Sequence, residues 1–152
     1  MKNKIPYLSR KLQNFRVLQK VGDMRLHDST SELAKVQQRQ HGLRQDLLRS
    51  QAKLAELAVP SNNVLVPELM ASQSLYVGQL VRQQQQTELQ LQQQNQLVDE
   101  QLNTVLKLKK TNQLVADKIV NTRGQMINVV DQQMDEAISD IRRATTTNMK
   151  EE

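Results

Sequence analysis

The residue types that could do chemistry in this chain are two histidines and one group of carboxylates. His27 and His41 lie fourteen residues apart, and the sequence has no cysteine, so the further ligands of a metal site and the partner groups of a general base are missing. The carboxylates are Asp131, Asp135, Glu136 and Asp140. They lack the glycine-containing loop of a calcium site, and no glycine-rich loop is present to hold phosphates. We therefore expect no metal, no cofactor and no enzymatic activity.

The composition indicates helices rather than an ordinary globular core. The chain has 152 residues, enough for one domain, but only 2% are aromatic, with four glycines, three prolines and no tryptophan. Aliphatic side chains must supply nearly all the buried area, which is typical of long helices packed side by side. There is no cleavable leader pattern and no run of eighteen apolar residues. We expect a cytoplasmic protein that does not insert into a membrane.

The net charge of +5 is unevenly distributed along the chain. Residues 1–58 contain 12 Lys/Arg against 5 Asp/Glu, whereas residues 59–152 contain 9 against 11. A basic first half can attract an acidic partner, although a solvated helix face explains the same charges. The cations are spaced singly and no aromatic stacking platform accompanies them. We therefore expect no nucleic-acid partner.

The hydrophobic pattern predicts a first helix over residues 5–58. Positions separated by alternating steps of three and four form an unbroken seam, the repeat of a coiled coil. The sixteen positions are Ile5, Leu8, Leu12, Phe15, Gln19, Gly22, Leu26, Ser29, Leu33, Val36, Gln40, Leu43, Leu47, Ser50, Leu54 and Leu57. Five of them are polar or glycine, which predicts a seam of reduced stability.

A loop at residues 59–66 separates this helix from a second one. Pro60 cannot lie inside a helix, whereas Pro67 suits the first helical turn, so we predict the second helix over residues 67–144 and a frayed tail over 145–152. Its stripe is expected at Val77, Val81, Gln84, Glu88, Leu91, Asn95, Val98, Leu102, Val105, Lys109, Asn112, Ala116, Ile119, Arg123, Met126, Val130, Gln133 and Ala137.

The predicted fold is all-α: residues 1–152 form a single long antiparallel two-helix coiled-coil hairpin whose second helix is the longer one. Folding back at the loop leaves some residues of the second helix beyond the start of the first. Ile127, Val130, Met134, Ile138 and Ile141 then make an apolar stripe that nothing in the chain covers. Exposed stripes of this kind mark partner sites.

Three features of the chain resemble those of one known family. A basic helix precedes a short Pro/Asn break and a longer helix; residues 71–94 read ASQSLYVGQLVRQQQQTELQLQQQ; and residues 131–143 read DQQMDEAISDIRR. In this plan and these motifs the chain resembles the FliJ/SctO family, the central stalk proteins of the flagellar and virulence type III secretion export apparatus.

The resemblance implies a non-enzymatic stalk that inserts into the hexameric export ATPase. It also implies contact with the cytoplasmic ring of the export-gate membrane protein, so that ATP hydrolysis is coupled to protein export. Tyr76, Leu80 and Gln83 match the gate-contacting stretch. The ATPase-contacting part corresponds to Ile5, Leu8, Leu12, Phe15, Ile127, Val130, Met134, Ile138 and Ile141. The implied location is the bacterial cytoplasm, peripheral to the inner-membrane export apparatus.

Other interpretations remain open. The chain could be a self-associating coiled-coil scaffold or an export chaperone, or a nucleic-acid-binding hairpin. Within the stalk interpretation, the sequence does not separate a flagellar from a virulence system, and secretion chaperones are further candidate partners.

Overall fold

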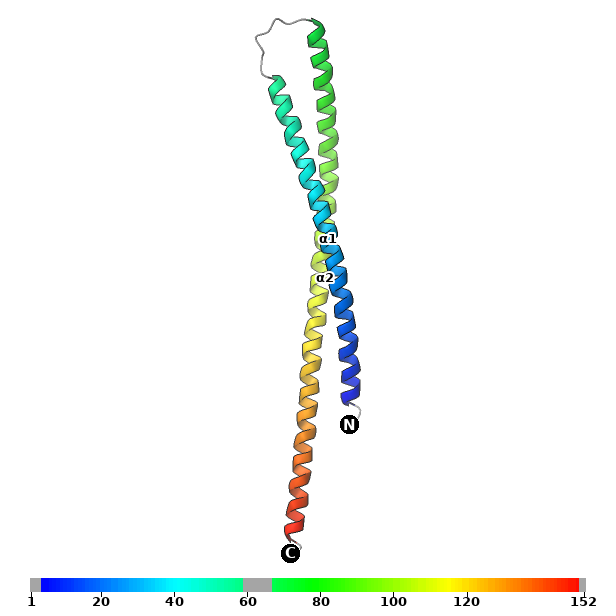
Figure 1. The fold of residues 1–152 in the computed structure, drawn as a ribbon, viewed down its shortest axis with the longest axis vertical. Coiled ribbons are helices and arrows are strands. Elements are labelled where there is room, and N and C mark those ends of the chain that lie inside the picture. The colour runs from blue at the N-terminus through cyan, green and yellow to red at the C-terminus, as the bar shows by residue number, and fades with distance from the viewer. Residues whose placement is uncertain (1–3, 59–66, 151–152) are drawn as a thin grey trace. The chain divides into compact units, whose positions relative to one another are not determined.

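The computed structural model describes residues 4–58 and 67–150, all of which are helical. Helix α1 spans Lys4–Ala58 and helix α2 spans Pro67–Lys150, and the two pack against each other (Figure 1). The predicted all-α class with two packed helices is therefore confirmed. The loop predicted at 59–66 and the last two residues of the predicted tail lie outside the described residues.

The start of α2 follows the predicted sequence signals, but its end lies further along the chain. The helix begins at Pro67, with Glu68 in its first turn. It then continues through the predicted frayed tail to Lys150. Thr145, Thr146 and Thr147 each donate a hydroxyl hydrogen bond to the carbonyl oxygen four residues earlier, at 2.5, 2.7 and 2.7 Å. This back-bonding lets threonine remain helical despite its poor propensity.

Contacts within the chain define two units, and each contains a segment of both helices. The terminal unit comprises Met1–His27 and Lys107–Glu152, and the central unit comprises Asp28–Leu106. Within each unit the segment of α1 lies alongside the segment of α2 (Figure 1).

The seam of α1 matches the predicted pattern. All sixteen predicted positions are buried or half-buried, and every other described residue of α1 except Lys11 is exposed. Lys11 is covered because its Nζ lies 5.9 Å from the centre of the Phe15 ring, a cation–π distance. Hydrophobic spacing therefore identified the packed face of α1 residue by residue.

The seam of α2 follows the predicted stripe only in part. Ten predicted positions are covered as expected: Val77, Gln84, Leu91, Asn95, Val98, Val105, Asn112, Ala116, Ile119 and Met126. The seam also includes eight positions that lie one residue before a predicted one, at Leu80, Thr87, Gln94, Gln101, Leu108, Val115, Thr122 and Val129. Four of these are polar, namely Thr87, Gln94, Gln101 and Thr122, and at Leu102 the more hydrophobic neighbour is the exposed one. At Glu88, Lys109 and Arg123 the predicted residue is charged and exposed, so the error lies in the assumed spacing and not in hydrophobicity alone.

The core is thin and partly polar in both units. Leu8, Leu12, Ile119 and Thr122 are buried in the terminal unit, and the central unit buries polar Ser29, Ser50, Thr87 and Gln94 beside Leu33, Leu80 and Val105. No described side chain is completely buried. This is the expected result when each helix has only one neighbour.

Glutamine side chains cross the seam in the central unit. Gln94 Nε2 donates to the Val36 carbonyl oxygen at 3.1 Å. One heptad further, Gln101 Nε2 donates to the Ser29 carbonyl oxygen at 3.1 Å and to Ser29 Oγ at 2.8 Å. From Gln94 to Gln101 the residue number on α2 rises by seven, and the contacted residue on α1 changes from Val36 to Ser29, seven positions lower. Buried amides of this kind fix the register of paired helices.

Candidate partner-binding surfaces

The first group of predicted ATPase contacts, on α1, faces α2. Leu8 and Leu12 are buried, and Ile5 and Phe15 are half-buried. The Phe15 ring also has Lys118 Nζ of α2 at 5.8 Å from its centre. A partner of the closed helix pair therefore cannot reach Leu8 or Leu12, whose role is to hold the start of α1 against α2.

The second group, on α2, is exposed, and we call it the terminal stripe: Ile127, Val130, Met134, Ile138 and Ile141. Their exposed fractions lie between 38% and 68%, and none occupies a seam position. All described residues from 131 to 150 are exposed. The terminal stripe is therefore a surface that α1 does not use.

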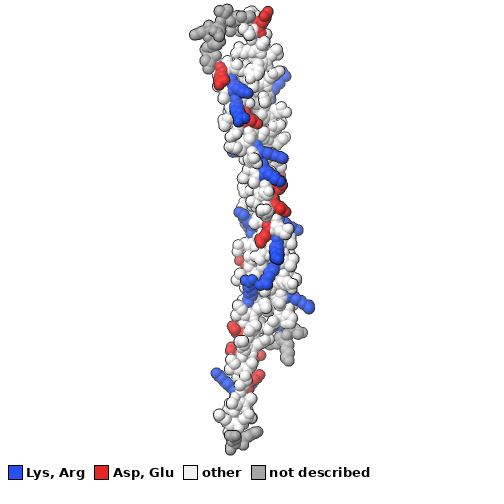
Figure 2. Space-filling view, in the orientation of Figure 1, with Lys and Arg blue, Asp and Glu red and all other residues white. Residues whose placement is uncertain are grey.

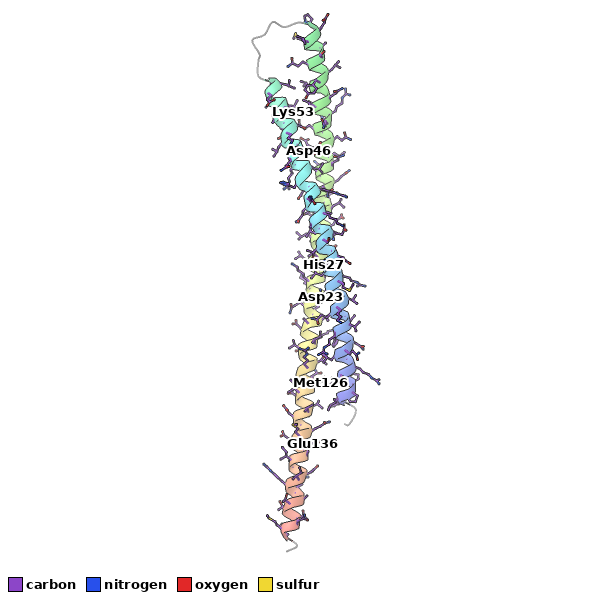
Figure 3. All side chains as sticks on the ribbon, in the orientation of Figure 1. Asp23, His27, Asp46, Lys53, Met126 and Glu136 are labelled. Carbon is purple, nitrogen blue, oxygen red and sulfur yellow. The ribbon has the colours of Figure 1, made fainter. Side chains whose placement is uncertain are left out.

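After Val129 the apolar residues of α2 no longer occupy seam positions and lie on another face of the helix. Continued at the same spacing, the seam positions would hold Gln133, Glu136, Asp140 and Arg143, all polar or charged. Figure 3 shows Met126 on α2 beside the first turns of α1 and Glu136 on the part of α2 beyond them. The change of face thus coincides with the end of helix pairing.

The terminal stripe has an acidic border. Asp131, Asp135, Glu136 and Asp140 accompany it, and no Lys or Arg occurs between Gly124 and Ile141. Figure 2 shows acidic side chains on this part of α2. Within residues 4–58 and 67–150, ion pairs join only Lys35 to Glu32 and Arg49 to Asp46, so these four carboxylates have no cationic partner there.

A shallow groove adjoins this region where α1 begins. It is lined by Lys4, Val129, Gln132, Gln133, Glu136, Ala137 and Asp140. Four of its lining residues carry amides or carboxylates, and Val129 and Ala137 add apolar surface. It presents hydrogen-bonding groups next to an apolar stripe, as the rim of a protein interface does.

The structure divides the predicted gate contacts. Tyr76 is 46% exposed and Gln83 is exposed, whereas Leu80 is only 5% exposed and occupies a seam position. The resemblance places Leu80 among the gate contacts by its position in the motif, which does not specify the helix face on which it lies. Tyr76 and Gln83 remain accessible to a partner, and Leu80 packs against α1.

Three exposed apolar side chains near the start of α2 were missed at the sequence level. Leu69, Met70 and Leu75 are 65%, 49% and 73% exposed. Together with Tyr76 they give the first turns of α2 an apolar surface. The sequence could have indicated them, because all three are apolar residues that lie off the stripe predicted for α2, where side chains are expected to be exposed.

The titratable residues considered for catalysis do not assemble into a site. His41 Nε2 is hydrogen-bonded to Gln45 Nε2 at 3.0 Å on the exposed surface of α1. In the described parts of both helices, no three side chains of the His, Asp and Glu types come close enough to share a metal ion. Neither helix has, in its described residues, an apolar stretch able to span a membrane.

Comparison of the chain with protein-family models, with curated proteins and with solved structures finds no match.

Proposed function

We propose that this chain is the non-enzymatic stalk of a type III secretion export apparatus. It would form a long antiparallel coiled-coil hairpin with α2 the longer helix, located in the bacterial cytoplasm at the inner-membrane export apparatus. Its terminal unit would insert into the hexameric export ATPase, and its central unit would contact the cytoplasmic ring of the export gate. ATP hydrolysis would thereby be coupled to protein export.

The terminal stripe is the observation that carries this proposal. Five apolar side chains at steps of three and four stay exposed where the seam of α2 ends, one just before its last position and four beyond it. Such a face is costly to leave in water and is normally covered by a partner. An amphipathic helix presented in this way is suited to a groove in another protein.

The pairing of α1 and α2 supports the antiparallel arrangement. In the central unit Ser29 contacts Gln101, and Val36 contacts Gln94. In the terminal unit Asn112 Nδ2 donates to Asp23 Oδ1 at 3.5 Å, and Phe15 lies near Lys118. In both units the number on α2 falls as the number on α1 rises.

The proposed gate contact rests on the exposed start of α2. Tyr76 and Gln83 are the accessible members of the predicted set, and Leu75 extends their surface. These residues belong to the central unit, whereas the terminal stripe belongs to the other. Different units would thus carry the two contacts that a coupling stalk needs.

A binding experiment tests the proposal. The chain is titrated into the hexameric export ATPase of the same organism, and binding is followed by analytical ultracentrifugation. We expect the variant Ile127→Ser/Val130→Ser/Met134→Ser to bind at least about tenfold more weakly, because it loses apolar area that complex formation would bury.

A matched control separates this effect from a general loss of apolar surface. Leu89, Leu97 and Leu114 are 57%, 48% and 62% exposed on the same helix, and none is a seam position. The variant Leu89→Ser/Leu97→Ser/Leu114→Ser should bind like the unaltered chain. Equal weakening by both triple variants would count against the assignment of the stripe.

The exposed terminal stripe also favours the second candidate function, a self-associating scaffold or export chaperone. A scaffold would assemble without an ATPase and would not change the rate of ATP hydrolysis. The ATPase experiments therefore distinguish the two functions.

A further inference from the structure

A second apolar surface lies on the outer face of α1, in the terminal unit. Val17, Val21 and Met24 follow one another at steps of four and three, and Tyr7 lies ten residues before Val17, with Arg10 and Asn14 at the intervening positions of the same face. The exposed fractions of Val17, Val21, Met24 and Tyr7 are 56%, 40%, 68% and 64%. None is a seam position, so this outer face is free of α2.

The outer face of α1 is bordered by cations. Arg10, Lys20 and Arg25 are exposed, and within residues 4–58 and 67–150 no carboxylate forms an ion pair with any of them. The segment from Lys4 to Arg25 holds six Lys/Arg and only one acidic residue, Asp23. The outer face of α1 is therefore apolar and basic, whereas the terminal stripe is apolar and acidic.

These two surfaces have similar lengths. The terminal stripe runs from Ile127 to Ile141, fifteen residues, which is about 22 Å of helix. The α1 outer face runs from Tyr7 to Met24, eighteen residues, which is about 27 Å. The continuous apolar part of the α1 face, from Val17 to Met24, is eight residues long, about 12 Å, and can cover about half of the terminal stripe.

Within one molecule the two surfaces cannot meet. The seam of α1 faces α2, and Val17, Val21 and Met24 lie off that seam. Helix α2 is continuous through the terminal stripe to Lys150, so it cannot turn back to reach the outer face of α1. Contact between them requires two copies of the chain.

We propose that the terminal stripe of one copy binds the outer face of α1 of a second copy. Apolar side chains would pack along the contact, and Asp131, Asp135 and Asp140 would lie near Arg10, Lys20 and Arg25. Pairing one terminal stripe with another would instead bring eight carboxylates together without a cation between Gly124 and Ile141. The electrostatics therefore favour unlike surfaces.

Because the two surfaces differ, the interface is heterologous: each copy has one of each, and association continues from copy to copy. This goes beyond the proposed stalk function and uses the terminal stripe in a competing way. A copy bound through its stripe to another copy would not be available to the export ATPase.

Sedimentation velocity on the full chain, without any ATPase, tests the proposal. The unaltered chain should self-associate as its concentration rises, and should do so less when salt is raised from about 0.05 M to about 0.5 M, because the charges are then screened. The face variant Arg10→Glu/Lys20→Glu/Arg25→Glu and the stripe variant Met134→Ser/Ile138→Ser/Ile141→Ser should each associate at least about tenfold more weakly.

The decisive sample is an equimolar mixture of the two variants. The face variant retains a terminal stripe and the stripe variant retains a basic face, so the mixture should form dimers that cannot extend. As a charge control, Arg39→Glu/Arg44→Glu/Lys53→Glu makes the same charge change at exposed positions of the central unit and should associate like the unaltered chain. That expectation holds at matched salt.

Three results would overturn the proposal. One is an unaltered chain that stays monomeric at all concentrations. Another is full association of the face variant alone, which would show that stripe pairs with stripe. The third is a mixture in which both variants remain monomeric. None of these results depends on ATPase binding, so the stalk function and the self-association stand or fall separately.

Discussion

At the scale of single residues, the hydrogen bonds of Gln101 define how α1 and α2 are held in register. Gln101 bonds to both the carbonyl oxygen and the hydroxyl of Ser29, and Ser29 is itself only 9% exposed. A shift of either helix by one residue would leave these buried polar groups unpaired. Leaving such a group unpaired costs more than its hydrogen bond contributes.

A double-mutant cycle on Ser29→Ala and Gln101→Ala measures this contact. We expect a coupling energy of about 1 kcal/mol in urea unfolding, since each single change removes the same side-chain hydrogen bond. The control cycle combines Ser50→Ala with Gln101→Ala, two residues without a shared contact, and should be additive within about 0.5 kcal/mol. Additivity in the Ser29 cycle would show that the bond does not contribute to stability.

Gly22 is the one glycine whose missing side chain makes room for a neighbour. A Cβ at Gly22 would overlap Oδ1 of Asn112, whereas a Cβ at Gly42, Gly78 or Gly124 would meet nothing within 4 Å. All four glycines lie inside helices, where glycine costs about 0.5–1 kcal/mol relative to alanine.

Alanine substitution should therefore change the free energy of unfolding differently at Gly22 than at a glycine with no neighbour, such as Gly124. Gly124→Ala should raise the free energy of unfolding by about 0.5–1 kcal/mol, while Gly22→Ala should give no gain because Asn112 must move. In an Asn112→Ala background the gain at position 22 should return. An equal gain at both glycines in the unaltered background would contradict the contact with Asn112.

At the scale of whole helices, α1 could be predicted from its sequence and α2 only in part. Every seam position of α1 follows from hydrophobic spacing, because its polar exceptions such as Ser29 fall between strongly apolar neighbours in the repeat. In α2 the seam uses Thr87, Gln94 and Gln101 while Leu102 stays exposed. Hydropathy alone cannot identify a seam whose amides are paired across the interface.

The candidate partner surfaces, too, could be predicted from the sequence only in part. The terminal stripe was predicted from its uncovered position, and all five of its side chains are exposed. Leu80 was carried over by position from the resemblance and lies in the seam. A motif match fixes residue type and order, but the face on which a residue lies depends on the register of the paired helices.

The end of α2 should make little contribution to the stability of the helix pair. All described residues after Val130 are exposed, so a chain that ends at Gln133 should unfold in urea with a midpoint close to that of the full chain. Helical circular dichroism should fall in proportion to the residues removed. A clear loss of stability would show that the terminal stripe packs within the chain.

At the scale of the whole molecule, the two units divide the proposed tasks. The terminal unit carries the terminal stripe with its acidic border, and the central unit carries Tyr76 and Gln83. The partly polar seam joins α1 to α2, and in the central unit glutamine amides cross it to backbone carbonyls. The proposed coupling function needs separate contacts for two partners, and this division would provide them.

The rate of ATP hydrolysis by the export ATPase of the same organism is the most direct test of the stalk function. Added to the hexamer, the full chain should raise the rate, and the variant Ile127→Ser/Val130→Ser/Met134→Ser should raise it several-fold less. The variant Leu89→Ser/Leu97→Ser/Leu114→Ser should act like the full chain. A hydrolysis rate that is unchanged by the full chain, measured where binding is saturated, would contradict the proposed function.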